Sequence, residues 1–206
     1  MDGALVLAGG SSSRMGTDKA WLELDGRPLL EHVVSVLAGC CGVIVIAARP
    51  GQQLPPLAGH PVERVDDPVP DGGPLVGVVA GLERLAAHGV ARAYLGSCDA
   101  AAVSARHVEF MLAQLRAAQQ LDPGVCAVVP REPDGRVHPL AAAVAVDAMH
   151  AHAQTELARG QLRLQRVFGA AQLQVIEVAA LPDPDALLPC NTPAQWRALA
   201  RTISSR

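Results

Sequence analysis

Aromatic residues are scarce in this sequence: Trp, Tyr and Phe make up 2% of its 206 residues. Proteins that bind single-stranded nucleic acids stack bases on aromatic rings, and most nucleic-acid binders carry a strongly basic surface. Here the formal net charge is -3. Both properties argue against a nucleic-acid partner, so any anionic ligand must be bound by a local cluster of cations.

Long apolar runs are also missing. No run approaches the roughly 18 residues that a membrane span requires, and no basic segment precedes the first apolar run. We therefore expect a cytoplasmic protein without a membrane partner. The spacing of the five cysteines fits neither a disulfide framework nor paired zinc ligands, so we interpret them as small buried hydrophobic residues. Because 50% of the residues are hydrophobic, one domain spanning residues 1–206 is expected.

Short apolar runs alternate with segments of helical periodicity. The runs predict strands near residues 4–8, 43–48, 91–95, 125–130, 140–146 and 173–178, and the periodic segments predict helices near 29–37, 75–87, 105–118, 149–158 and 193–200. Thr192 is predicted to cap the last helix, with Pro193 in its first turn. Continuously apolar strands indicate a sheet covered on both faces, which is an α/β sandwich of three layers with a mostly parallel sheet.

The segment from Leu7 to Lys19 follows the first predicted strand and combines glycines with cations. Gly9 and Gly10 remove side chains where backbone amides can approach phosphate oxygens. Arg14 and Lys19 can offset the charge of a triphosphate and of a departing pyrophosphate. The segment matches neither the ATPase phosphate loop nor the dinucleotide fingerprint. It predicts a distinct kind of triphosphate site.

This segment resembles a signature of the nucleotidyltransferases that activate molybdopterin and sugar phosphates, L-A-G-G-x-S-x-R-M-G-x-D-K. Every defined position is matched, from Leu7 to Lys19. Further similar segments lie at 25–30 (turn and Pro-Leu helix start), 73–77 (G-P-L-x-G), 97–99 (x-C-D), 138–139 (H-P) and 191–193 (N-T-P). Over nearly its full length the chain resembles the bacterial molybdenum cofactor guanylyltransferases, which implies a Rossmann-like nucleotidyltransferase fold.

The resemblance also implies roles for particular residues. The backbone of Leu7, Ala8, Gly9 and Gly10 would place the nucleotide, with Gly73 close to it and Asp67 against the nucleoside. Asp99 would bind the cofactor Mg²⁺, a hard ion that prefers oxygen ligands. Arg14 and Lys19 would act on the phosphates, and Arg163 and Asn191 on the acceptor side, although an Asn at this place can also be a helix cap. His138 is given no catalytic role.

The reaction implied is attack by the terminal phosphate of molybdopterin, or of its molybdenum form, on the α-phosphorus of GTP. Pyrophosphate leaves and no covalent nucleophile is needed. The nucleotide would bind to the half around residues 1–100 and the acceptor to the half around 101–206. Brief contact with proteins that mature molybdoenzymes is expected.

The residues leave two alternative functions open. One is a CTP-dependent molybdopterin cytidylyltransferase, or a transferase for another small phosphorylated metabolite; the cytidylyl enzymes more often read Ala-Ala-Gly where this chain has Ala8-Gly9-Gly10. Ile46 stands where some relatives carry a nucleoside-binding Asn, which leaves base contacts to backbone groups. The other alternative is a non-catalytic nucleotide-binding module. It is favoured by the alanines after Asp99, where the family usually has Thr or Met followed by Pro.

Overall fold

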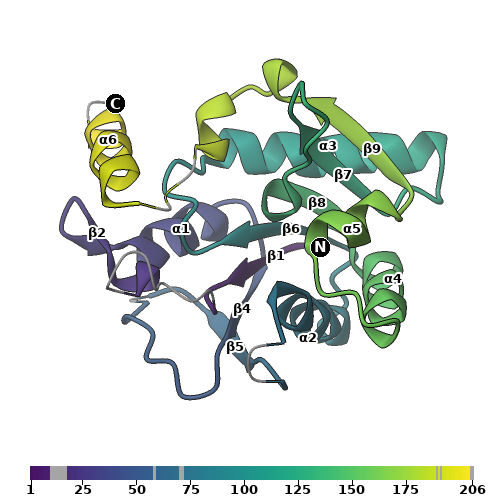
Figure 1. Cartoon of the computed structure of the whole chain (residues 1–206), viewed down its shortest axis with the longest axis horizontal. Helices are drawn as coiled ribbons and strands as arrows, with labels where there is room; N and C mark the ends of the chain where they lie inside the picture. Colours follow the sequence, from purple (N-terminus) through teal and green to yellow (C-terminus); the bar gives the residue numbers. More distant parts are fainter. Residues whose placement is uncertain (10–17, 58, 70–71, 189, 191, 205–206) are drawn as a thin grey trace.

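The computed structural model describes residues 1–9, 18–57, 59–69, 72–188, 190 and 192–204. A seven-stranded sheet of order β5-β4-β1-β6-β8-β7-β9 runs through its centre (Figure 1). The pairs β1–β4, β1–β6, β4–β5 and β7–β9 are parallel, whereas β8 runs antiparallel to β6 and β7. The predicted mostly parallel α/β sheet is therefore confirmed. Its strands are β1 (Asp2–Leu7), β4 (Val43–Ala48), β5 (Val62–Asp66), β6 (Arg92–Ser97), β7 (Ala127–Arg131), β8 (Ala142–Ala145) and β9 (Leu173–Glu177).

Helices cover both faces of this sheet. Along β1, Ala4 and Val6 pack with α1 (Leu29–Ala38) and α3 (Ala105–Leu121), while Leu5 points to the opposite face. That second face is covered by α2 (Pro74–Ala87), α4 (Val146–Ala158) and α5 (Leu164–Gly169). Successive side chains of a strand point to opposite faces, so a strand with a core on each side must be apolar throughout. This burial explains the unbroken apolar runs of the sequence.

In the central sheet and the helices that cover it, β5 and α5 were not predicted. Strand β5 reads Val-Glu-Arg-Val-Asp and lies at the edge of the sheet, where exposed charges are tolerated and protect the edge from unwanted pairing. Helix α5 has only six residues, too few to show a clear periodicity. The start of the predicted strand 140–146 is instead a 3-10 helix, η2 (Pro139–Ala141), because Pro139 interrupts the strand pairing.

The last helix, α6 (Pro193–Ser204), begins as predicted: the Thr192 hydroxyl accepts a hydrogen bond from the Gln195 amide at 3.2 Å. A small core that includes Leu29, Ala102 and Leu199 joins α6 to α1 and to the segment after Asp99. The remaining elements are β2 (Glu23–Leu24), β3 (Arg27–Pro28), η1 (Lys19–Trp21), η3 (Val178–Ala180) and η4 (Pro184–Leu187). Within the described chain, none of the helices has both the length and the apolar character of a membrane span.

Candidate active site

A cavity of about 450 Å³ lies beyond the carboxyl ends of β1, β4 and β6, and we call it the nucleotide cavity. This is the position at which parallel α/β sheets bind ligands, because the loops gather there. Gly10 and Arg14 lie outside the described residues. The other residues predicted for nucleotide and metal all line this cavity: Leu7, Ala8, Gly9, Lys19, Asp67, Gly73 and Asp99.

Lys19 and Asp99 form an ion pair in this cavity. The Nζ atom of Lys19 lies 2.5 Å from Oδ2 of Asp99, and the Ser97 hydroxyl donates to Oδ1 of Asp99, also at 2.5 Å. The two charged side chains keep 18% and 24% of their surface exposed. They are therefore partly shielded from water but still open to a ligand. Lys19 is the only lysine of the chain.

The segment after Asp99 is firmly held although it lacks the family's usual Pro. The Ala100 amide donates to the Ser97 carbonyl at 3.1 Å, and the Val103 amide donates to the Ala100 carbonyl at 3.0 Å. Ala101 is fully buried. Turn hydrogen bonds and burial thus fix the backbone next to Asp99 in place of a proline ring.

Asp67 lines the nucleotide cavity and carries one buried, unpartnered carboxylate oxygen. Its Oδ1 atom is buried and makes no hydrogen bond, a costly state for a polar atom. Burial is the main cause that raises the pKa of Asp67; Asp66 adds to this effect and Arg49 opposes it. A Cβ atom at Gly77 would lie 2.8 Å from this oxygen, so only glycine leaves room for the carboxylate there. The carboxylate thus packs against α2 through Oδ1, while its other oxygen, Oδ2, lies close to Gly9, which lines the cavity.

The N-terminus of α2 also borders this cavity. Gly73 precedes the helix with φ of 78°, a conformation that glycine adopts without strain, and Pro74 occupies the first helical turn. Gly72, Gly73 and Pro74 all line the cavity. The free N–H groups and the positive end of the helix dipole favour an anion at this point.

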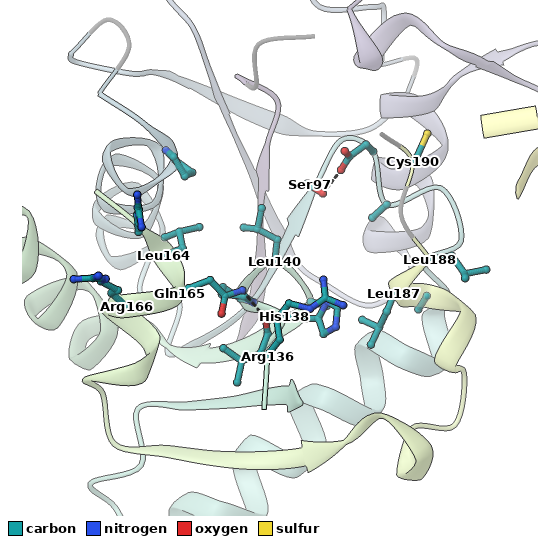
Figure 2. Close-up of a pocket in the computed structure, with 18 residues that line it drawn as sticks. Ser97, Arg136, His138, Leu140, Leu164, Gln165, Arg166, Leu187, Leu188 and Cys190 are labelled. Atoms are coloured by element: carbon teal, nitrogen blue, oxygen red, sulfur yellow. Dashed lines mark hydrogen bonds between the residues drawn. The ribbon is translucent and has the colours of Figure 1, made fainter. Parts of the chain in front are cut away.

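A second cavity, of about 630 Å³, adjoins the first, and we call it the acceptor cavity (Figure 2). Arg163, predicted on the acceptor side, lines it together with Arg136, Arg166 and His138. In Figure 2, Arg166 and Cys190 lie on opposite sides of the view, with His138 and Leu140 between them. Asn191 lies outside the described residues. The cavity therefore offers several basic side chains to an anionic ligand.

Glu132 orients two of these basic side chains, those of His138 and Arg136. Its Oε1 atom lies 2.8 Å from Nε2 of His138 and 3.6 Å from a guanidinium nitrogen of Arg136. The sequence pattern gives neither Arg136 nor Arg166 a role, because isolated arginines carry no motif. The predicted Arg163 and the H-P dipeptide at His138 are the signals that the sequence offers for this cavity.

The two cavities share a short boundary. Pro74, Ser97, Asp99 and Leu140 line both of them. Ligands in the two cavities would therefore meet at the carboxylate of Asp99. Ile46, the position at which some relatives were expected to carry an Asn, is buried in the core that also contains α1 and α3, and it does not line the nucleotide cavity.

Two thiols border the cavities, Cys98 and Cys190. Burial is the main cause that raises the pKa of both, and the Asp99 carboxylate adds to the effect. Since the thiolate is the nucleophilic form of cysteine, both side chains stay protonated and unreactive at neutral pH.

The donor set at the boundary fits a single Mg²⁺ ion. Asp99 supplies hard oxygen atoms, and the phosphate oxygens of a ligand in the nucleotide cavity, together with water, could complete the coordination shell. Within the described residues, no group of three or more His, Cys, Asp or Glu side chains surrounds a common point. Asp99 would thus bind the ion as its principal protein ligand.

The fold matches that of known nucleotidyltransferases. A molybdopterin-guanine dinucleotide biosynthesis protein A from Archaeoglobus fulgidus superposes with a TM-score of 0.75 at 18% identity, covering 100% of both chains. A 2-C-methyl-D-erythritol 4-phosphate cytidylyltransferase from Thermus thermophilus superposes with a TM-score of 0.67 at 19% identity, again covering 100% of both. The sheet, its helices and the cavity at its strand ends thus define a nucleotidyltransferase fold.

Sequence relatives place the chain in one family. The model of the MobA-like NTP transferase domain matches residues 4–175, and the chain belongs to this family. A relative from Mycobacterium tuberculosis, described as a probable molybdenum cofactor guanylyltransferase, is 40% identical over 145 residues, which are 69% of this chain and 67% of the relative. A relative of the same description from Synechococcus elongatus is 30% identical over 95% of this chain and 96% of its own length.

Proposed function

We propose that this protein transfers GMP from GTP to molybdopterin or its molybdenum form and releases pyrophosphate. The meeting of the nucleotide and acceptor cavities at Asp99 is the observation that carries this proposal. The names of the sequence relatives support the choice of nucleotide and acceptor. In this reading the nucleotide binds mainly to residues before 100 and the acceptor mainly to residues after 101.

The acceptor phosphate needs positioning more than activation. It is already anionic, so the protein must hold it in line with the α-phosphorus and offset the charge that grows on the leaving pyrophosphate. Arg163, with Arg136 and Arg166 beside it, would bind the acceptor anion. Lys19 and Arg14 would act on the triphosphate and stabilise the departing charge.

Asp99 and Ser97 lie at the boundary of the two cavities, where the metal would bind. When bound, Mg²⁺ would offset part of the negative charge of the triphosphate and orient the phosphate oxygens. Asp99 would hold the ion, and the hydrogen bond from Ser97 fixes one carboxylate oxygen in place. Lys19 would move its ammonium group from Asp99 to the phosphates when the site fills.

The nucleoside would lie against Asp67 and the backbone of residues 7–10. Asp67 lines the cavity with Oδ2 close to Gly9, and this carboxylate suits an N–H or O–H donor of the nucleoside. We assign Gly73 to the phosphate side, at the N-terminus of α2, and Asn191 to the acceptor side.

Pyrophosphate release tests this function. The protein is incubated with Mg²⁺ and each of the four nucleoside triphosphates, with and without molybdopterin. We expect release from GTP only, and only when molybdopterin and Mg²⁺ are both present. Release from CTP instead would retain the reaction but correct the base. Tight GTP binding with no release from any nucleotide would favour the non-catalytic binding module.

A further inference from the structure

Gln52 is a buried polar side chain beside the nucleotide cavity, with only 8% of its surface exposed. It ends a tight turn that starts at Arg49: the Gln52 amide donates to the Arg49 carbonyl at 3.0 Å, and Gly51 has φ of 73°. Pro50 and Gly51 are the residue types that a type II turn favours at its two central positions. The sequence of this turn thus fixes where the Gln52 side chain begins.

The side-chain amide of Gln52 is fully paired. Its Nε2 atom donates to the Ala8 carbonyl at 3.0 Å and to Oδ2 of Asp18 at 2.8 Å. Its Oε1 atom accepts from the Arg49 amide at 3.1 Å. A side-chain amide has two N–H donors, and both are used. The three bonds fix the amide in one orientation, with its nitrogen facing Ala8 and Asp18.

The two acceptors lie at opposite ends of the signature segment. Ala8 directly follows β1, and Asp18 directly precedes Lys19. The second carboxylate oxygen of Asp18 accepts from the Ala20 amide at 3.1 Å and so caps η1, the short helix that carries Lys19. Gln52 therefore connects the end of β1 to the start of η1.

We propose that Gln52 is a positioning residue of the nucleotide site. By holding Ala8 and Asp18 together, it sets the distance between the backbone that places the nucleotide and the ammonium group of Lys19 that acts on the phosphates. The inference rests on the proposed function. The 2.5 Å contact between Lys19 and Asp99 depends on the position of η1, which Gln52 helps to fix through Asp18.

The first test replaces Gln52 by glutamate. Gln52→Glu turns both donors into acceptors that face the Ala8 carbonyl and the Asp18 carboxylate. We expect kcat/KM for GTP to fall on the order of 10²-fold, the effect of a small displacement of a reacting group, and the Kd for GTP to rise. The exposed neighbour gives a matched control: Gln53→Glu should leave both constants within about twofold, since surface changes are usually small.

A double variant separates positioning from general stability. Gln52→Glu combined with Asp18→Asn exchanges donor and acceptor between the two side chains, so the bond between positions 52 and 18 can form again. We expect it to recover roughly tenfold of the lost kcat/KM, about the value of one hydrogen bond. Gln52→Met, of similar length but without hydrogen bonds, should lose roughly tenfold and guards against a glutamate variant that fails to fold.

Thermal unfolding and GTP binding by calorimetry are measured on the same samples. If both single variants at position 52 bind and turn over GTP like the wild type, or lose activity only in proportion to lost folded protein, the inference is wrong. The same holds if the double variant recovers nothing. A wild type that makes no dinucleotide contradicts the proposed function instead, and GTP binding by the variants still decides the role of Gln52.

Discussion

The two cavities are built in different ways. The nucleotide cavity is lined largely by small residues, such as Ala8, Gly9 and Gly77, whereas the acceptor cavity combines apolar side chains with three long basic ones, Arg136, Arg163 and Arg166. A backbone that the sheet holds in place fits only one ligand shape. Long cations select charge and can adapt to a larger ligand. The difference suggests that nucleotide specificity lies in geometry and acceptor binding in electrostatics.

The largest effect is expected at the shared boundary. Asp99→Asn keeps the size of the side chain but removes the charge that would hold Mg²⁺. We expect kcat to fall on the order of 10³-fold whichever substrate is varied, because metal assistance contributes several kcal/mol. Steady-state kinetics with both substrates provide the check. Asp147→Asn, an exposed change in α4, is the control, and an Asp99 variant as active as this control would refute the shared boundary.

The second effect concerns the nucleotide cavity alone. Lys19→Ala removes the cation that would stabilise the leaving pyrophosphate, and turnover should fall roughly 10²-fold or more. The KM for molybdopterin should change little. Lys19→Arg tests whether charge alone is enough, because the planar guanidinium has a different reach. An alanine variant within about threefold of wild type would remove Lys19 from the mechanism.

The third effect should be confined to the acceptor cavity. Arg163→Ala removes a charged hydrogen-bond donor, and we expect the KM for molybdopterin to rise roughly 10- to 100-fold. Calorimetry should find the Kd for GTP unchanged. Arg159→Ala is the matched control, since Arg159 is exposed, pairs with Glu156 and lines neither cavity. A large change in GTP affinity with Arg163→Ala would show that the two cavities are not separate in function.

The smallest effect concerns Asp67 and has opposite signs for stability and binding. Its raised pKa means that ionisation opposes folding: stability is lost as pH rises from the unfolded value near 3.8 through the folded value. Asp67→Asn should therefore raise Tm at neutral pH, and the gain should vanish below the unfolded pKa. GTP affinity should fall roughly tenfold, the loss of one good acceptor. Calorimetric unfolding across pH would contradict this account if the Tm gain were equal at every pH.

The sequence predicted the nucleotide cavity far better than the acceptor cavity, for physical reasons. Residues 7–19 act together as one segment, so their spacing already carries the geometry of the site. The predicted residues of this segment that the structure describes do lie together, with Asp67 and Asp99 joining them from other strand ends. The hydrogen bond from Ser97 to Asp99 becomes visible only in the folded structure.

The acceptor cavity is assembled from separate helices, loops and a strand end. Arg136 and Arg166 come from distant parts of the sequence and carry no common pattern, so only tertiary structure brings them together. The same limit applied to β5, whose alternating charges are typical of an edge strand but also of a solvated loop. The roles of all the predicted site residues stay predictions, and Gly10, Arg14 and Asn191 also lie outside the described part of the chain.

The central claim is direct transfer between ligands that meet at Asp99. The most direct test incubates the protein with Mg²⁺, molybdopterin and GTP labelled at the α-phosphorus, and follows the label into protein and small molecules. We expect the label in a product with the mass of molybdopterin joined to GMP, with none on the protein. Label bound covalently to the protein, or released only as free GMP, would contradict it.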